Sequence, residues 1–187
     1  MGAGGAGRPI CIRPVGTIDE DVLRRLRKEI GDYLEAPVVV LDPVGIPDGS
    51  FEKGRNQYNS TKILKEVLGG APPGAFKILG LIDRDLCIPI LTFVFGEAQL
   101  GGIASVVSLA RLRQEFHGLA PDARVFRDRL HKECLHELGH AFGLIHCPDG
   151  GCAMRLSNTV LDVDRKERTY CADCLAAVRA KIDSGRS

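Results

Sequence analysis

One eleven-residue stretch constrains this chain more than any other part of the sequence. It runs from His136 to His146 and has the spacing H-E-x-x-H-x-x-G-x-x-H. On a helix, His136 and His140 project from one face on adjacent turns, so both imidazoles can bind the same metal ion. Gly143 suits a helix C-terminus, where a left-handed residue has no Cβ strain. The chain can then turn sharply and bring His146 to the same ion.

Three histidine ligands indicate zinc, with the fourth tetrahedral position open to water. Glu137 directly follows the first of these histidines. A carboxylate at this place can hold a zinc-bound water and accept its proton. We therefore predict a catalytic zinc site in which Glu137 is the general base and the ligands are His136, His140 and His146.

A second metal site is predicted by the cysteines that follow this stretch. Cys147 comes directly after His146, and the spacing C-x4-C-x18-C-x2-C continues through Cys152, Cys171 and Cys174. Two short-spaced pairs of thiolates are the usual way to form a closed, structural zinc site. Such a zinc contributes on the order of 10 kcal/mol to a small unit, and this segment has few large apolar residues. The alternatives are two disulfides, or a zinc-ribbon-like module that binds nucleic acid.

Composition narrows the partners and the compartment. The net charge of +1 in 187 residues gives no electrostatic reason to expect nucleic acid. No apolar run reaches the ~18–20 residues that span a membrane, and no signal peptide is visible, so we expect a cytoplasmic protein without a membrane partner. The chain has seven cysteines. In a reducing compartment, cysteines are more often metal ligands or buried thiols than disulfides. Outside the predicted zinc site, we expect core thiols at Cys11, Cys87 and Cys134.

The rest of the chain is expected to form a mixed α/β lobe. Its strand–helix–strand beginning implies a right-handed crossover between parallel strands. Residues 42–56 are expected to form a loop. The composition changes near Gly143, so we place a boundary between an N-terminal lobe, 1–143, and a C-terminal lobe, 144–187. Apolar runs predict strands at 10–15, 37–41, 76–82, 91–95 and 103–109, and helical periodicity predicts helices at 20–34, 61–68, 125–144 and from about 170 onward.

The motif and its continuation resemble a known family. Met154 comes eight residues after His146, and this arrangement is similar to the signature of the metzincins, in which a Met-turn follows the zinc motif. The interleaved cysteines make the likeness more specific, because their spacing relative to His146 and Met154 resembles that of the archaemetzincins. The matching residues span 136–174. The order of strands and helices upstream agrees with the N-terminal lobe of that family.

This resemblance implies a metzincin-like zinc metallopeptidase. Its upper lobe would contain a mixed, mostly parallel sheet with an antiparallel edge strand, helices, and an active-site helix with the zinc ligands. A small C-terminal lobe would hold the Met-turn and the four-cysteine zinc. The resemblance therefore implies two Zn²⁺ ions per chain, one catalytic and one structural. By analogy with the metzincin edge strand, substrate contact is expected near residues 96–102. Leu156 stands where some other metzincins have a metal-binding tyrosine, so no such ligand is expected here.

The predicted function is hydrolysis of a peptide or protein substrate. Glu137 would accept a proton from the zinc-bound water and pass it to the leaving amine, while zinc polarises the scissile carbonyl. The alternative is a non-enzymatic, zinc-stabilised module that binds peptides or proteins. The intact Glu137 argues against this alternative, because a binding module has no need of a general base.

Overall fold

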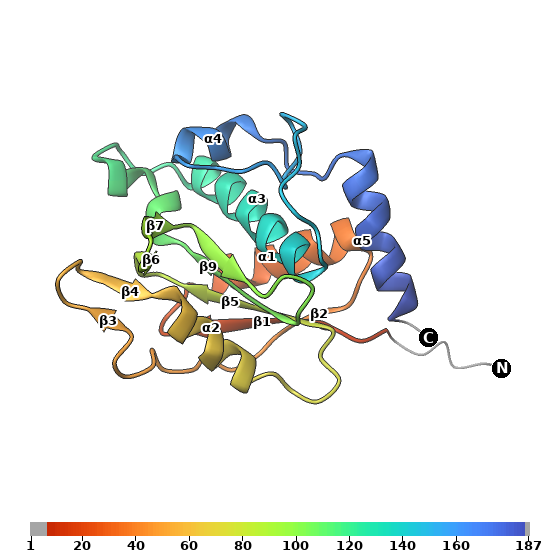
Figure 1. Cartoon of the computed structure of the whole chain (residues 1–187), viewed down its shortest axis with the longest axis horizontal. Helices are drawn as coiled ribbons and strands as arrows, with labels where there is room; N and C mark the ends of the chain where they lie inside the picture. The colour runs from red at the N-terminus through yellow and green to blue at the C-terminus, as the bar shows by residue number, and fades with distance from the viewer. Residues whose placement is uncertain (1–6, 186–187) are drawn as a thin grey trace.

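A five-stranded sheet forms the centre of the computed structural model, which describes residues 7–185 (Figure 1). Its strand order is β2-β1-β5-β9-β8. The first four strands are parallel, and β8 pairs antiparallel with β9 at one edge. This is the mixed, mostly parallel sheet with an antiparallel edge strand that was predicted. The strands span Ile10–Val15 (β1), Val38–Val40 (β2), Lys77–Ile82 (β5), Gly96–Ala98 (β8) and Ala104–Ser108 (β9).

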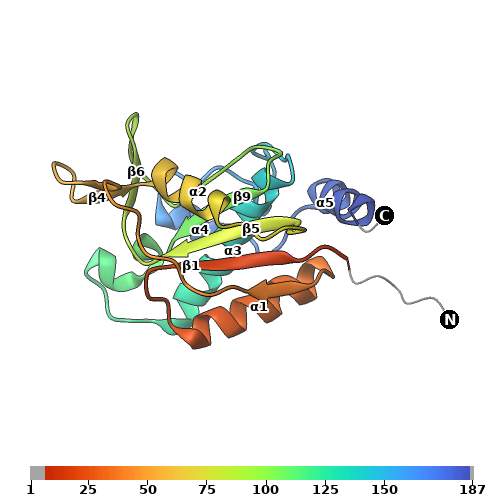
Figure 2. The same ribbon diagram turned by 90° about the horizontal axis from the view of Figure 1, so that it is seen from below.

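Helices cover both faces of this sheet, which explains why its central strands are mostly apolar. Helix α1, Glu20–Leu34, and helix α3, Ala123–Ala141, pack on one face, and helix α2, Ser60–Gly69, packs on the other. Figure 2 shows α2 and α1 on opposite sides of β1 and β5. Successive residues of a strand point to opposite faces. Ile10 and Ile12 therefore join the core under α1 and α3, whereas Cys11 and Val15 join the core under α2.

A second, smaller sheet corrects one prediction and contains one of the predicted strands. Residues 42–56 are not all loop, because they contain β3. The predicted strand 91–95 forms β7 in this second sheet, and the segment after it forms β8 in the central sheet. Arg55 explains part of this arrangement, since its guanidinium donates hydrogen bonds to carbonyls on both sides of the β6–β7 turn, at Ile88 (3.0 Å) and Thr92 (2.7 Å). The second sheet has the order β3-β4-β6-β7, with strands at Phe51–Glu52, Gln57–Asn59, Leu86–Ile88 and Leu91–Val94.

Local capping decides where the later helices begin and end. Helix α3 begins two residues earlier than predicted because the Asp122 carboxylate accepts hydrogen bonds from the first-turn amides. It ends at Ala141, before Gly143, which has a φ of 99°. Helix α4, Val160–Arg165, was not predicted; Thr159 and Asp162 form a capping box at its start. Helix α5, Ala172–Ser184, is the predicted C-terminal helix.

The main core crosses the predicted lobe boundary. Residues of α3, such as Leu138, belong to the same buried apolar cluster as Met154 and Val178. The division at residue 143 stays a prediction. Within residues 7–185, no helix has the length and apolar character needed to cross a membrane.

We expect Gly80→Ala to destabilise the fold. A Cβ at this position of β5 would lie 2.5 Å from Val67 Cγ2 of α2 and 3.3 Å from Val106 Cγ2 of β9. Overpacking of this kind costs about 1–3 kcal/mol, which urea denaturation would measure. Gly54→Ala is the control, because nothing lies within 4 Å of its added Cβ. Equal denaturation midpoints for Gly80→Ala and the parent would contradict the close packing of α2 on β5.

Candidate active site and metal centres

The three histidines of the motif converge on one point. Helix α3 carries His136 and His140, and the turn after it carries His146. Their ring centroids are 4.6, 4.9 and 5.3 Å apart, and one nitrogen of each ring lies within 4.8 Å of the others. The structure therefore brings the three predicted ligands together in a group that could hold a metal ion.

Hydrogen bonds orient two of these imidazoles. His136 Nδ1 donates to the carbonyl of Ala153 (2.8 Å), and His140 Nδ1 donates to the carbonyl of Leu144 (2.7 Å). With the proton on Nδ1, each Nε2 carries a free lone pair, and the two Nε2 atoms are 3.1 Å apart. Two facing lone pairs repel unless a cation lies beside them. The donor set therefore fits a metal such as zinc.

Burial keeps the histidines neutral. Desolvation lowers the pKa of His136 well below its ordinary value, and the nearby Lys166 ammonium lowers it further. Burial also lowers the pKa values of His140 and His146. Neutral imidazole is the form that binds a metal.

A tight turn brings the third histidine to the site. The amide of Gly143 donates to the His140 carbonyl and the amide of Leu144 to the Gly139 carbonyl, both at 2.9 Å. The positive φ of Gly143 lets the chain leave the helix axis at once. This is the role that the sequence predicts for Gly143.

Glu137 is buried beside the edge strand. A Cβ on Gly96 of β8 would lie 2.6 Å from Glu137 Cγ, so the absence of that atom makes room for the glutamate. Burial raises the pKa of Glu137 well above its ordinary value, and the carboxylate of Glu133 raises it further. Glu137 and the three histidines line a cavity of about 430 Å³ that is bounded by residues 91–98 and by Leu156, Ser157 and Asn158.

Met154 lies directly beneath the motif helix. It is fully buried, and a Cβ on Gly139 would lie 2.2 Å from its sulfur. The glycine of H-E-L-G-H therefore admits the methionine between the two histidine-bearing turns. This is the position expected for a Met-turn.

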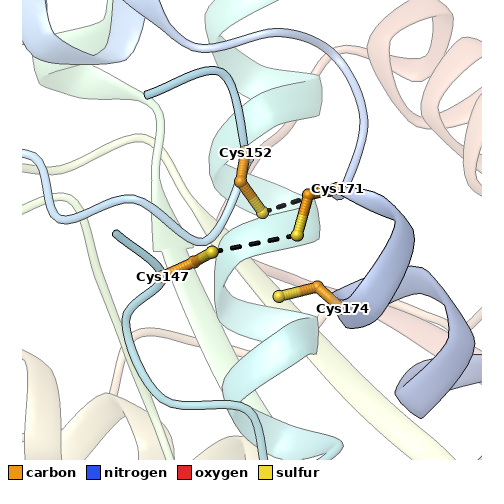
Figure 3. Close-up of side chains that lie close together, drawn as sticks. All are labelled: Cys147, Cys152, Cys171 and Cys174. Atoms are coloured by element: carbon orange, nitrogen blue, oxygen red, sulfur yellow. Dashed lines mark hydrogen bonds between the residues drawn. The ribbon is translucent and has the colours of Figure 1, made fainter. Parts of the chain in front are cut away.

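The four predicted cysteines also converge (Figure 3). Their four Sγ atoms all lie within 4.8 Å of one another, and those of Cys147 and Cys171 are 3.8 Å apart. The amides of Met154 (3.4 Å) and Cys171 (3.3 Å) donate to Cys152 Sγ. An amide hydrogen bond from Cys174 lowers the pKa of the Cys171 thiol, whereas burial raises the pKa values of Cys152 and Cys174. Such hydrogen bonds stabilise thiolates, which are the form that binds zinc.

The alternative of two disulfides is wrong. All seven cysteines, each of which lies in the described part of the chain, are free. Cys11, Cys87 and Cys134 are buried, as predicted; Cys11 joins the core under α2 and Cys134 the core under α1 and α3.

A buried ion pair beside the histidines was missed by the sequence analysis. Lys166 Nζ lies 2.8 Å from a carboxylate oxygen of Glu133, and both side chains are almost inaccessible to solvent. Glu133 also lines the cavity. Glu133 lies one helical turn before Glu137, so the sequence could have indicated that both carboxylates share one face of the helix. The partner of Glu133, Lys166, lies 33 residues away. Pattern reasoning gives no hint of that pairing.

Two further histidines are held elsewhere. His131 is buried against α1, where its Nδ1 lies 3.2 Å from a carboxylate oxygen of Glu29. His117 Nε2 lies 2.9 Å from the carbonyl of Arg111. Neither belongs to the three-histidine group.

Known proteins are similar to this chain in sequence and in fold. The model of peptidase family M54 matches residues 44–180. Archaemetzincin of Methanocaldococcus jannaschii is 42% identical over 89% of this chain and 90% of its own length. The crystal structure of archaemetzincin from Methanopyrus kandleri has a TM-score of 0.83 and 33% identity, covering 96% of this chain and 97% of that one. A zinc-dependent peptidase from Methanocorpusculum labreanum has a TM-score of 0.80 and 32% identity, covering 90% of this chain and 99% of that one.

The fold, its metal-binding groups and these relatives define a zinc metallopeptidase, an enzyme that acts on peptide or protein substrates. More narrowly, the chain belongs to peptidase family M54, the archaemetzincins. The resemblance seen in the sequence is thereby confirmed, and the non-enzymatic alternative is not supported.

We expect Gly139→Ala to be destabilising although it replaces a glycine inside a helix. That replacement ordinarily stabilises by about 1 kcal/mol, but here the new Cβ would lie 2.2 Å from Met154 Sδ. A net loss of about 1–3 kcal/mol is expected from overpacking, measured by urea denaturation of the zinc-loaded protein.

Gly31→Ala is the matched control, because this α1 glycine would make only ordinary contacts at 3.5 Å. Combining Gly139→Ala with Met154→Ala should cost less than the sum of the two single changes. Strict additivity would show that Gly139 and Met154 do not pack against each other.

Proposed function

We propose that this chain cleaves peptide bonds at the centre formed by Glu137 and three zinc-binding histidines, His136, His140 and His146. The observation that carries the proposal is geometric. Three neutral imidazoles and one buried carboxylate open onto the same cavity, beside an edge strand. Zinc bound by the three histidines would polarise the scissile carbonyl and make the attacking water more acidic.

Glu137 would carry the proton. One carboxylate oxygen accepts a proton from the attacking water and then delivers it to the amine that leaves. A general base works best when its pKa lies near the working pH, and the raised pKa of the buried Glu137 supports this role. Gly96 keeps the carboxylate in place, since any side chain there would collide with it.

Strand β8 is our proposed site of substrate contact. A peptide can add to a free sheet edge through main-chain hydrogen bonds, and β8 is the antiparallel edge strand that borders the cavity. The proposed contact segment is shorter than the expected residues 96–102. The amide of Gly101 already donates to the His140 carbonyl and that of Gly102 to the Gln99 carbonyl, both at 2.9 Å. We therefore restrict the pairing edge to Gly96–Ala98.

We further propose that the four cysteines hold a structural zinc that supports the catalytic one. Cys147 directly follows His146, and its amide donates to the Met154 carbonyl (3.0 Å). Cys152 directly precedes Ala153, whose carbonyl orients His136. Two of the cysteines are thus adjacent in sequence to residues of the histidine site, Cys147 to His146 and Cys152 to Ala153. The cytoplasmic location and the lack of a nucleic-acid partner stay predictions.

Glu137→Gln should abolish turnover and leave the zinc bound. The change keeps the shape of the side chain but removes the proton acceptor, so kcat/KM for a fluorogenic peptide should fall at least ~100-fold. Zinc content by elemental analysis should match the parent. Glu66→Gln, at an exposed position of α2, should keep full activity. Parental turnover by Glu137→Gln would contradict the proposed mechanism.

Cys171→Ser should release the structural zinc and reduce peptidase activity as well. We expect about two zinc ions in the parent and fewer than two in the variant, because the loosened cysteine segment no longer holds His146 and Ala153. Cys87→Ala, a core thiol far from both groups in sequence, should keep both ions. Loss of one zinc with unchanged activity would refute the coupling. A parent with one zinc and four titratable thiols at the cysteine group would refute the structural site.

A further inference from the structure

We propose that Glu97 is a positioning residue that ties β8 to the first turn of α2 and so holds the substrate-binding edge in place. This inference rests on the proposed function, since it assigns a role to the strand that would bind the peptide. Glu97 is the middle residue of β8 and directly follows Gly96, which faces Glu137.

The tie consists of two hydroxyl groups and one carboxylate. Ser60 Oγ donates to Glu97 Oε2, and Thr61 Oγ1 lies 3.0 and 3.1 Å from the two carboxylate oxygens. Ser60 is fully buried. Ser60 and Thr61 are the first two residues of α2, whose N-terminus also favours a negative charge. Hydrogen bonds to a charged acceptor are stronger than neutral ones.

Strand β8 has little support from sheet pairing. It is three residues long and, among residues 7–185, pairs only with β9, although α2 and α3 pack beside it. Its register places Glu97 opposite Val106, whose side chain belongs to the core under α2. Gly96 lies opposite Val107, which belongs to the core under α3. Glu97 therefore anchors the strand from the α2 face, while its free edge borders the cavity.

The tie also joins the two sheets beside the cavity. Ser60 directly follows β4, and its Oγ lies 3.3 Å from the carbonyl of Cys87 on β6. Both strands belong to the second sheet, whereas Glu97 belongs to the central one. A shift of Glu97 would therefore move the pairing edge relative to the wall formed by residues 91–95.

Glu97 also borders the cavity, so an alternative is that its charge recognises a basic substrate. Its carboxylate already accepts from two hydroxyls, which favours the anchoring role. Two variants separate these roles. Glu97→Gln removes the charge but can still hydrogen bond with both hydroxyls, because a hydroxyl can donate or accept. Glu97→Ala removes the tie and the charge together.

The test measures kcat and KM with a neutral octapeptide, and the binding of two inhibitors to the zinc-loaded enzyme. We expect Glu97→Ala to raise KM about tenfold with little change in kcat. It should weaken a peptidyl hydroxamate about tenfold and leave acetohydroxamate, which reaches only the metal, within twofold. Glu97→Gln should restore most of the loss. Glu52→Ala is the control, since it removes another carboxylate that bonds a neighbouring side chain, Asn59, without contacting β8.

Each other result has a distinct meaning. A parental KM and parental peptidyl-hydroxamate affinity for Glu97→Ala would overturn the proposal. Equal losses for Glu97→Ala and Glu97→Gln would also overturn it, because the charge would then matter and not the tie. If Glu97→Ala fails to fold, Thr61→Val removes one of the two hydroxyls and should raise KM about threefold; an unchanged KM would count against the tie. No peptide cleavage by the zinc-loaded parent would refute the proposed function, whereas the hydroxamate affinities would still test the tie.

Discussion

The hydrogen bond from His136 Nδ1 to the carbonyl of Ala153 connects the two metal-binding groups. It fixes the orientation of the imidazole and the nitrogen that faces the other histidines. A single hydrogen bond contributes only about 0.5–1.5 kcal/mol, so its importance lies in geometry. Ala153 stands between Cys152, one of the four clustered thiols, and Met154, which packs under α3. One short segment therefore supports the histidines from below and contributes a thiol to the cysteine group.

Close backbone approach is the second constraint on this site. Gly139 lets Met154 pack between the two histidine-bearing turns, and Gly96 lets β8 pass beside Glu137. In both places a methyl group would occupy space already filled by a side chain. The active-site helix is thus pressed between a strand on one side and the methionine turn on the other. Packed interiors transmit such displacements because they contain few voids.

The parts of the candidate site that the structure arranges as expected are those set by local chain geometry. The spacing of His136 and His140 places both rings on one helix face, whatever surrounds the helix. The glycine at 143 permits the turn that follows, and the C-x2-C pair of Cys171 and Cys174 lies at the start of α5. Each of these features depends on residues within about two helical turns. The central sheet could be predicted for the same reason, since its buried strands are continuous apolar runs.

The features that were missed depend on residues far apart in the chain. Lys166 meets Glu133 across 33 residues, and Glu97 meets Ser60 across 37. The strand predicted at 91–95 is present as β7, but its place in a second sheet, where Arg55 bonds the Thr92 carbonyl, was not predicted. Local propensity describes one segment at a time and contains no information on which segments become neighbours. The sequence alone was therefore enough to predict the two groups, three histidines and four cysteines, that the structure brings together. Which strand borders them, and what holds that strand, came from the packing of the whole chain, because burial and long-range hydrogen bonds choose those partners.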